Sequence, residues 1–415
     1  MTRKPIYVNE KSSVEIEYSE EESPKVTVYI DGSEHVFEDE TTEDAKVQYA
    51  FKTKKNKYSE FLSYQFDNLV FLTGAGSSCG IGVDDKKGQL MSGLWNEAVS
   101  SLGQDKIDRF CNLVKYTYKE TKEDGSKVWI KNLEKLLSLA DLAKDFVEDP
   151  QPDDKVDIKE MIHDIKELIK DKCNLELPED APHSLFLSKI TKRKTSLPRV
   201  KIFTLNYDTL FEQAALKGNF TVIDGFSYSY PRYFSGRNFD YDIVVRYGNR
   251  IKKEDNFVNR VFHLYKPHGS VNWKLEGDEI AQAKPNEINV DESLMIYPQS
   301  NKYEHSYEQP FFEMMSRFQQ VLRQDNVMLI TIGFSFGDKH IVTAIKEALE
   351  QNPGFQLMVV NKGIETDGQM KWLYKLAKEH SNIVLVDELF ADFAKGYPDT
   401  TIYDQDEYKL IKIQK

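Results

Sequence analysis

One segment, N-L-V-F-L-T-G-A-G-S-S-C-G-I-G at residues 68–82, constrains the fold of this chain most strongly. Its nearly continuous apolar start is typical of a strand buried on both faces of a parallel sheet. The glycines that follow predict a tight turn with a helix N-terminus behind it, as at the opening of a doubly wound sheet. Cys79 stands where the dinucleotide fingerprint G-x-G-x-x-G requires its third Gly, and no G-K-[ST] follows. A glycine turn needed only for chain reversal therefore explains the segment about as well as a phosphate site does.

The rest of the chain repeats the alternation of apolar runs and helical periodicity. Further strands are predicted at residues 199–205, 257–265, 294–297, 326–333, 355–361 and 382–386. Helices are predicted from Thr209 onward and over residues 340–349. Strands and helices in this alternation indicate an α/β fold with a doubly wound, Rossmann-like parallel sheet covered on both faces.

Two long segments interrupt this alternation. Residues 90–195 are highly charged, place apolar residues at helical spacing and contain scattered prolines, so they predict a helical insertion. The stretch at 226–250 is dense in Tyr, Phe, Arg, Gly and Asn, and predicts a long loop of the kind that folds over a ligand.

The negative charge is concentrated near the N-terminus. The 415 residues carry a net charge of -13, and residues 15–44 hold twelve carboxylates but only one base. This balance argues against general binding of nucleic acid or anionic membranes. Alternating apolar positions around Asp31-Gly32, with H-V-F at 35–37 on the far side, predict a short β-hairpin. It is interpreted either as a solvated acidic appendage or as a surface for assembly or a partner.

The expected domain organisation follows from these segments. An acidic N-terminal β-hairpin extension covers residues 1–55, a nucleotide-binding domain that contains the insertion covers 56–395, and a C-terminal tail covers 396–415. We expect deletion of residues 1–50 to change the oligomeric state or regulation before it changes the chemistry.

The cysteines and the first residues indicate the cellular compartment. Cys79, Cys111 and Cys173 lie far apart without a C-x-x-C pair, which excludes the commonest zinc ribbons and a disulfide framework. The chain shows no apolar signal-peptide core and no run of 18 apolar residues. We therefore expect a soluble cytoplasmic protein without a bound metal.

Small and polar residues follow the predicted strands where the carboxyl ends of a parallel sheet bind ligands. They are Gly74, Ala75, Gly76 and Ser77 after the first strand, Thr204, Asn206 and Asp208 in T-L-N-Y-D, Gly333, Ser335 and Asp338 in G-F-S-F-G-D, and Asn361. Helix capping is the alternative explanation for Asp208, Ser335 and Asp338. Asn206 precedes the best capping position, so capping explains it less well.

His268 lies in the segment Y-K-P-H-G-S, between a proline that stiffens the chain and a glycine that bends it. A single histidine is more often structural than catalytic. The turn and its polar neighbours nevertheless favour a general base, because histidine titrates close to neutral pH.

The order and spacing of these motifs resemble those of the sirtuin family over about residues 66–390. The resemblance implies an NAD site that uses Gly74, Ala75, Gly76, Ser77, Gly333 and Ser335. It implies further that Asn206 and Asp208 lie by the nicotinamide ribose, that Asn361 lies near the adenosine ribose, and that His268 is the catalytic base.

Departures from the sirtuin pattern narrow the expected activity. Residues 274–296 contain no cysteine, whereas deacylating sirtuins carry a four-cysteine zinc module after the catalytic histidine. The chain is more similar to zinc-free sirtuin-like proteins of bacterial antiviral defence. That resemblance implies NAD hydrolysis in abortive infection, a homo-oligomer, and in some systems a separate HerA-type ATPase partner. An NAD or ADP-ribose sensor without turnover stays open as an alternative, and protein deacylation is disfavoured.

Overall fold

The computed structural model covers the 415-residue chain. The residues that it describes are 3–19, 24–64, 66–121, 125, 127–144, 156–194, 196–245, 256–296, 309–364 and 368–399.

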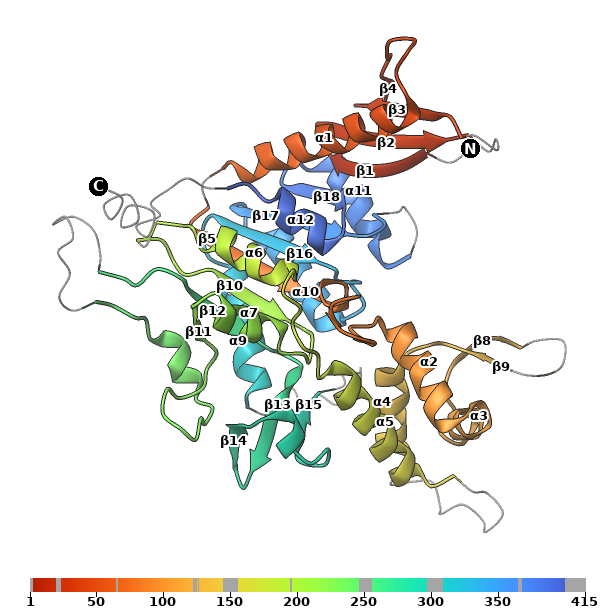
Figure 1. Ribbon diagram of the computed structural model, residues 1–415, viewed down its shortest axis with the longest axis vertical. Coiled ribbons are helices and arrows are strands. Elements are labelled where there is room, and N and C mark those ends of the chain that lie inside the picture. Colours follow the sequence, from red (N-terminus) through yellow and green to blue (C-terminus); the bar gives the residue numbers. More distant parts are fainter. Residues whose placement is uncertain are drawn as a thin grey trace.

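An eleven-stranded sheet forms the centre of the molecule (Figure 1). Seven of its strands are parallel and run in the order β11-β12-β10-β5-β16-β17-β18. Their bounds are β5 Asn68–Thr73, β10 Lys201–Thr204, β11 Thr221–Ile223, β12 Val261–Tyr265, β16 Val327–Ile332, β17 Phe355–Asn361 and β18 Ile383–Asp387. Every residue of β5 and β16 is buried, as their apolar sequences predict. The predicted parallel sheet is confirmed.

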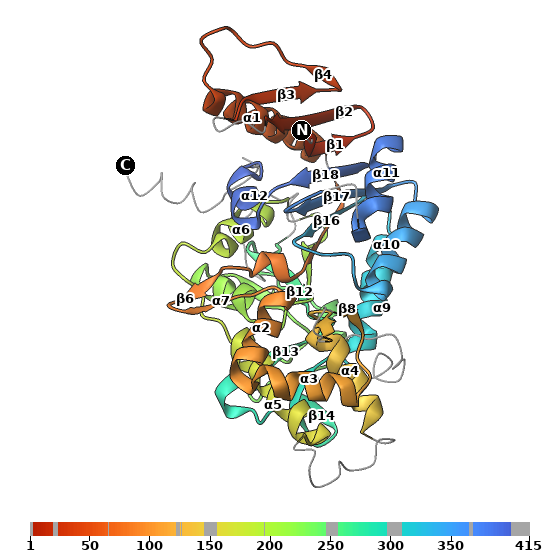
Figure 2. The same cartoon turned by 90° about the vertical axis from the view of Figure 1, so that its right-hand side faces the viewer.

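Helices cover both faces of this sheet, as Figure 2 shows edge-on. One face carries α6 (Pro182–Ile190), α7 (Leu210–Lys217) and α12 (Phe390–Gly396), and the other carries α9 (Phe311–Leu322), α10 (Lys339–Gln351) and α11 (Lys371–Glu379). Each layer buries its own apolar cluster against the strands. The doubly wound α/β architecture is therefore confirmed.

The N-terminal extension continues the central sheet with antiparallel strands. It comprises β1 (Arg3–Asn9), β2 (Ser12–Tyr18), β3 (Val26–Ile30), β4 (Ser33–Glu34) and α1 (Glu43–Leu62), and β1 pairs with β18. The predicted turn at Asp31-Gly32 joins β3 to β4, and both residues have positive φ, as a tight hairpin turn requires. The predicted hairpin is confirmed, although β4 ends at Glu34. His35 N–H still donates to the Val28 carbonyl over 2.8 Å, and the side chains of His35 and Phe37 pack on Tyr49 of α1.

The predicted domain limits remain predictions. The limit at residue 55 falls inside α1, and residues 400–415 of the predicted tail lie outside the described residues.

The insertion is mainly helical and has its own apolar core. It contains α2 (Met91–Leu102), α3 (Gln104–Leu113), α4 (Leu133–Ala143) and α5 (Ile158–Cys173), with an unpredicted hairpin of β8 (Tyr118–Thr121) and β9 (Lys127–Trp129). Tyr207, Val271 and Met295 from the main domain join this core. The insertion is thereby packed directly onto the segments that carry the T-L-N-Y-D and K-P-H-G-S motifs.

A separate three-stranded sheet, β14-β13-β15, follows His268. Its strands are β13 (Gly269–Glu276), β14 (Glu279–Gln282) and β15 (Ser293–Met295). The strand predicted at 294–297 belongs to this small sheet instead of the parallel one. The remaining short elements are η1 (Ala75–Ser77), β6 (Gly82–Val83), β7 (Lys86–Lys87), η2 (Gly236–Asp240), η3 (Pro285–Glu287) and η4 (Gly368–Met370).

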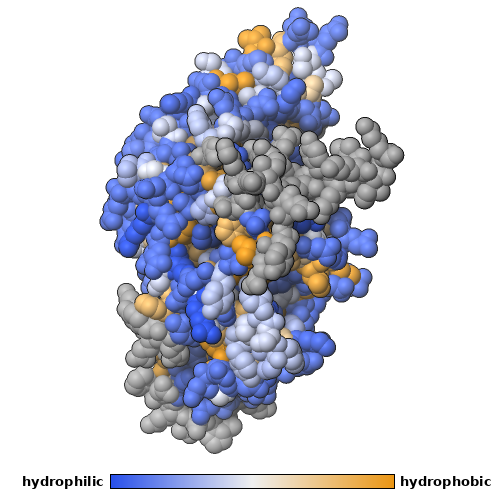
Figure 3. Space-filling view, turned by 90° about the vertical axis from the view of Figure 1, so that its left-hand side faces the viewer, coloured by the Kyte–Doolittle hydropathy of each residue, from blue (hydrophilic) through white to orange (hydrophobic). Residues whose placement is uncertain are grey.

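The surface matches the charged composition. Figure 3 shows a face on which hydrophilic side chains predominate and apolar ones form small separate groups. Within the described ranges, none of the helices combines the length and apolar character needed to cross a bilayer.

Candidate active site

A cleft of about 790 Å³ opens at the carboxyl edge of the parallel strands. Its wall takes residues that follow β5, β10, β12, β16, β17 and β18, and residues of α2, α4 and α5 from the insertion. Strand β5 lies between β10 and β16. After β5 the chain adds β10 and its neighbours on one side, and it later returns to add β16 and its neighbours on the other side. This reversal of strand order is where open α/β sheets bind their ligands. The volume lies within the range of ligand pockets, about 300–1,000 Å³.

Ten of the twelve residues predicted from the sequence line this cleft. They are Gly74, Ala75, Gly76, Asn206, Asp208, His268, Gly333, Ser335, Asp338 and Asn361. Ser77 and Thr204 are buried behind the wall. The Ser77 hydroxyl donates to the Gly74 carbonyl over 2.9 Å, and Thr204 Oγ1 accepts from the Asn206 backbone N–H over 3.2 Å. These two residues support the lining and do not face a ligand.

The two glycine turns pack against each other. A Cβ atom on Gly76 would lie 2.6 Å from Gly333 Cα, and one on Gly74 would lie 2.8 Å from the Gly333 carbonyl oxygen. Gly76 N–H also donates to that carbonyl oxygen over 3.0 Å. Contact between the two turns thus requires these glycines whether or not a ligand binds.

The turn after β5 differs from the predicted one. The sequence predicts a helix N-terminus directly behind it, but only the three-residue η1 and the small β6–β7 hairpin precede α2. The backbone N–H groups of Gly74, Gly76, Ser77, Ser78 and Cys79 donate to backbone carbonyls. These five amides, which include those of the predicted binding residues Gly74, Gly76 and Ser77, are therefore engaged within the protein.

Asn206 connects the first glycine turn to the T-L-N-Y-D segment. Its Nδ2 lies 3.0 Å from the Gly74 carbonyl oxygen and 2.8 Å from Ser78 Oγ. The Ser78 hydroxyl donates in turn to Asp208 Oδ2 over 2.6 Å, and Asp208 Oδ1 accepts from Leu210 N–H at the start of α7. Since the amide nitrogen is held by the turn, the amide oxygen of Asn206 is the atom suited to act on a ligand.

His268 forms an ion-pair contact that the sequence did not predict. It sits in the turn after β12, and its Nε2 lies 3.0 Å from Asp338 Oδ2. Asp338 is also the N-cap of α10, where Oδ1 accepts from the N–H groups of His340 and Ile341. Capping, the alternative explanation for Asp338, is correct, and the same carboxylate additionally holds the histidine.

This contact affects the ionisation of Asp338 and the tautomer of His268. Burial acts to raise the pKa of Asp338, but the hydrogen bond and charge of His268 and the two backbone N–H groups outweigh it, so the pKa is lowered. Whenever the His268 ring is neutral, the ionised carboxylate selects the tautomer with the proton on Nε2, because Nε2 then donates to it. Nδ1 is left as the basic atom of the ring.

The insertion contributes cleft residues that were not predicted, among them Glu134 of α4 and Lys172 of α5. Burial raises the pKa of the Glu134 carboxyl, and the nearby His268 only partly opposes this shift. Lys172 Nζ pairs with Glu97 over 2.7 Å. No motif marks these residues, and only the packing of the insertion on the sheet brings them to the cleft.

The end of β18 was not predicted as part of the site either. Glu388, which follows it, lines the cleft and lies 3.6 Å from Lys54 Nζ of α1. The Lys54 side chain is 3% exposed and also donates to the Asp387 carbonyl over 2.9 Å. The N-terminal extension thereby supports one rim of the cleft.

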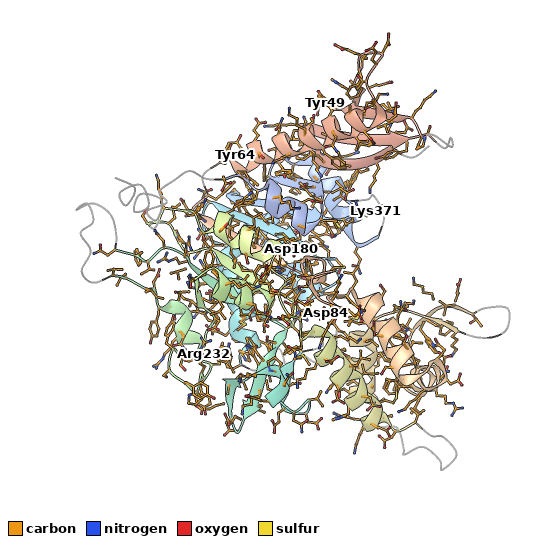
Figure 4. The ribbon with its side chains drawn as sticks, in the orientation of Figure 1. Tyr49, Tyr64, Asp84, Asp180, Arg232 and Lys371 are labelled. Carbon is orange, nitrogen blue, oxygen red and sulfur yellow. The ribbon has the colours of Figure 1, made fainter. Side chains whose placement is uncertain are left out.

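The described part of the long loop predicted at 226–250 does not line the cleft. This part consists of residues 226–245. They pack on β14 and α9 through contacts such as the one between Asp240 and Arg317. In Figure 4, Arg232 of this loop lies on the opposite side of the molecule from the insertion helices.

One family model matches a segment that carries several of these motifs. Residues 200–381 match the SIR2-like domain. The matched SIR2-like segment contains Asn206, Asp208, His268, Asp338 and Asn361, and it begins after the first glycine turn. No curated protein matches the chain.

A solved structure described as "The Structural basis of Sirtuin Substrate Affinity" aligns with 82% of this chain and 96% of its own chain. The sequence identity is 11% and the TM-score is 0.35.

Among the described residues, no three His, Cys, Asp or Glu side chains gather closely enough to hold a metal ion.

Proposed function

We propose that the protein hydrolyses the bond between nicotinamide and ribose in NAD and releases nicotinamide and ADP-ribose. The observation that carries this proposal is the placement of the His268–Asp338 pair in the same cleft as Asn206, at the point where the strand order reverses. The match to the SIR2-like domain supports an NAD-dependent activity in general.

The chemistry requires positioning more than acid catalysis. Nicotinamide leaves as a neutral molecule from a cationic ring, so the transition state resembles an oxocarbenium ion. As the C–N bond breaks, a water molecule forms the new C–O bond and loses a proton. His268 Nδ1 would accept this proton, and Asp338 would stabilise the imidazolium. The Asn206 amide oxygen would orient the water or the ribose hydroxyls.

The pyrophosphate needs positive partners other than the engaged amides of the first turn. Lys172 and Lys362 line the cleft, and Lys362 is only loosely paired, at 3.8 Å from Asp387. Residues Leu90 to Ser92, where α2 begins without a side-chain cap, also line it. We therefore place the diphosphate toward these groups, where ammonium charges and helix N–H groups stabilise anions.

The direct test is release of nicotinamide from NAD by the purified 415-residue chain. We expect His268→Ala and Asn206→Ala each to abolish cleavage while circular dichroism and the melting temperature stay close to those of the unmodified protein. His163→Ala serves as the matched control, because His163 lies on α5 outside the cleft lining with its side chain 43% exposed. Full activity of either cleft variant would contradict the assignment.

The same assay separates the alternatives. Tight NAD binding without nicotinamide release by the unmodified chain would favour a nucleotide sensor. Release that requires an acetylated peptide would favour deacylation.

The biological role we propose is depletion of NAD during antiviral defence, in a homo-oligomer that a separate HerA-type ATPase controls. Co-purification from the native host tests the partner, and cellular NAD measured during phage infection tests the role. Repeated recovery of the chain alone with full inducible activity would contradict control by a partner.

A further inference from the structure

Glu134 lies at one end of a chain of contacts that reaches both catalytic segments. Its Oε1 is 3.0 Å from the hydroxyl of Tyr207, the residue between Asn206 and Asp208 in the sequence. That hydroxyl is 2.5 Å from the Ile296 carbonyl oxygen, and Ile296 N–H donates to the His268 carbonyl over 2.8 Å. A side chain of the insertion is thus connected to the backbone beside the proposed base.

A second contact closes this arrangement. Val271 N–H donates to the Tyr207 carbonyl over 3.0 Å, and the Tyr207 ring is packed in the apolar core of the insertion. The position of Tyr207 therefore fixes the segment with Asn206 relative to the turn that carries His268.

The number of protons in these contacts specifies the state of Glu134. A phenol has one proton, and the Ile296 carbonyl oxygen can only accept a hydrogen bond. We assign this proton to the shorter contact, 2.5 Å from the Ile296 carbonyl oxygen, and not to the 3.0 Å contact with Glu134. The contact between Tyr207 and Glu134 is then a hydrogen bond only if the carboxyl carries a proton and donates it to the phenol oxygen.

The surroundings of Glu134 are consistent with a neutral carboxyl. The titratable groups that interact with it come from four other segments and are Tyr207, Cys173, His268 and Asp338. Lys172 of α5 is paired with Glu97, and Lys135 on the same helix lies over the Tyr116 ring. Burial of the carboxyl raises its pKa.

We infer that Glu134 is a positioning residue of the active site, which as a neutral acid donates to Tyr207 and so holds the Asn206 segment and the His268 turn in register. This inference rests on the proposed NAD hydrolysis. It assigns to the insertion a part in the reaction, and it predicts that activity falls when Glu134 loses its proton.

The test compares Glu134→Ala, Glu134→Gln and Tyr207→Phe for nicotinamide release from NAD at acidic, neutral and alkaline pH. Glu134→Ala should lower kcat about tenfold with little change in KM, because displacement of the reacting groups weakens catalysis more than binding. Glu134→Gln should restore most of this loss, since its amide still donates, and should abolish the decline at alkaline pH. Tyr207→Phe should match Glu134→Ala, and the double variant should be no worse than either.

A matched control is Glu160→Ala, in the first turn of the neighbouring helix α5, where Glu160 pairs with Lys106 at the surface. Its kcat should stay unchanged. A Glu134→Gln variant as defective as Glu134→Ala would overturn the inference, because it would show that the carboxylate itself is required. Normal kcat in Tyr207→Phe would overturn it as well.

If the unmodified protein releases no nicotinamide, the proposed function fails, and thermal unfolding then decides the inference separately. Glu134→Ala and Tyr207→Phe should each lower Tm by about 1–2 °C, with no further loss in the double variant. Additive shifts would show that the two side chains do not act together.

Discussion

At the scale of single residues, Asp338 performs two tasks that one substitution can separate. Its carboxylate caps α10 and holds His268 Nε2 at 3.0 Å. Asparagine caps helices about as well as aspartate, but it carries no charge to stabilise an imidazolium. We therefore expect Asp338→Asn to lower kcat for NAD cleavage by about 100-fold and to leave Tm nearly unchanged.

The control for this variant is Asp157→Asn, which changes another capping aspartate. Asp157 caps α5 and accepts from Glu160 N–H over 2.9 Å, outside the cleft lining. It should alter neither kcat nor Tm. A normal kcat in Asp338→Asn would show that the charge of Asp338 is not needed for the reaction.

Glu134 predicts a pH dependence of stability whose sign follows from its raised pKa. Between pH 4.5, the ordinary pKa of this carboxyl group, and its raised pKa in the folded state, the Glu134 carboxyl is more protonated in the folded chain than in the unfolded chain. The free energy of unfolding of the unmodified protein therefore falls as pH rises through that interval. Glutamine does not titrate, so Glu134→Gln should gain stability relative to the unmodified protein as pH rises, until Glu134 is ionised in the folded state. Urea unfolding at several pH values measures this difference, and a constant difference would contradict it.

The sequence predicts much of the residue-level site because glycine turns and strand ends leave local patterns. Asn206, His268 and Asp338 each follow an apolar strand in a recognisable motif, and the structure brings them to one cleft. The pairing of His268 with Asp338 joins positions 70 residues apart in the chain and has no local pattern. Glu134 occupies an ordinary first-turn position of an amphipathic helix, so only tertiary packing identifies it.

At the scale of elements, the two glycine turns behave as one packed unit. A side chain at position 76 would meet Gly333 backbone atoms, which cannot move without displacing the ends of β5 and β16. We expect Gly76→Ala to destabilise the fold by about 1–3 kcal/mol. Chemical denaturation measures this loss.

Gly93→Ala in α2 is the appropriate comparison, because the nearest atom to its added methyl group is the flexible end of Gln89. Alanine also favours a helix over glycine, so this variant should not lose stability. Equal stability of Gly76→Ala and the unmodified protein would show that the turns separate without cost.

The elements most easily predicted are the long, uniformly apolar parallel strands, because burial on both faces leaves an uninterrupted pattern. Strand β1 was not predicted, since its R-K-P-I-Y-V-N sequence mixes charge and proline with a short apolar run. The hairpin β8–β9 is short and lies within a highly charged stretch. Strand β13 was not predicted either; it begins at Gly269, directly after the turn that carries His268.

At the scale of the whole molecule, the acidic extension is continuous with the nucleotide-binding sheet. Tyr7 and Val8 of β1 pair with β18, and Lys4 Nζ lies 3.0 Å from Asp387 at the end of that strand. Deletion of residues 1–50 would expose the edge of β18 and remove the first eight residues of α1, and an open edge strand favours aggregation. A change of oligomeric state after that deletion would therefore have more than one cause, and the role of the acidic charge needs a milder change.

Three consecutive acidic residues, Glu38, Asp39 and Glu40, allow such a change because they are exposed and lie between β4 and α1. The combined variant E38Q/D39N/E40Q removes three negative charges and leaves every strand of the extension in place. If the acidic surface mediates assembly or a partner contact, the variant should change the mass measured by light scattering or the recovery of the partner. Nicotinamide release should stay within about twofold of the unmodified value, since these exposed charges lie outside the cleft lining and are screened by salt. An unchanged assembly and partner recovery, or a loss of NAD cleavage in a correctly assembled variant, would contradict this role for the extension.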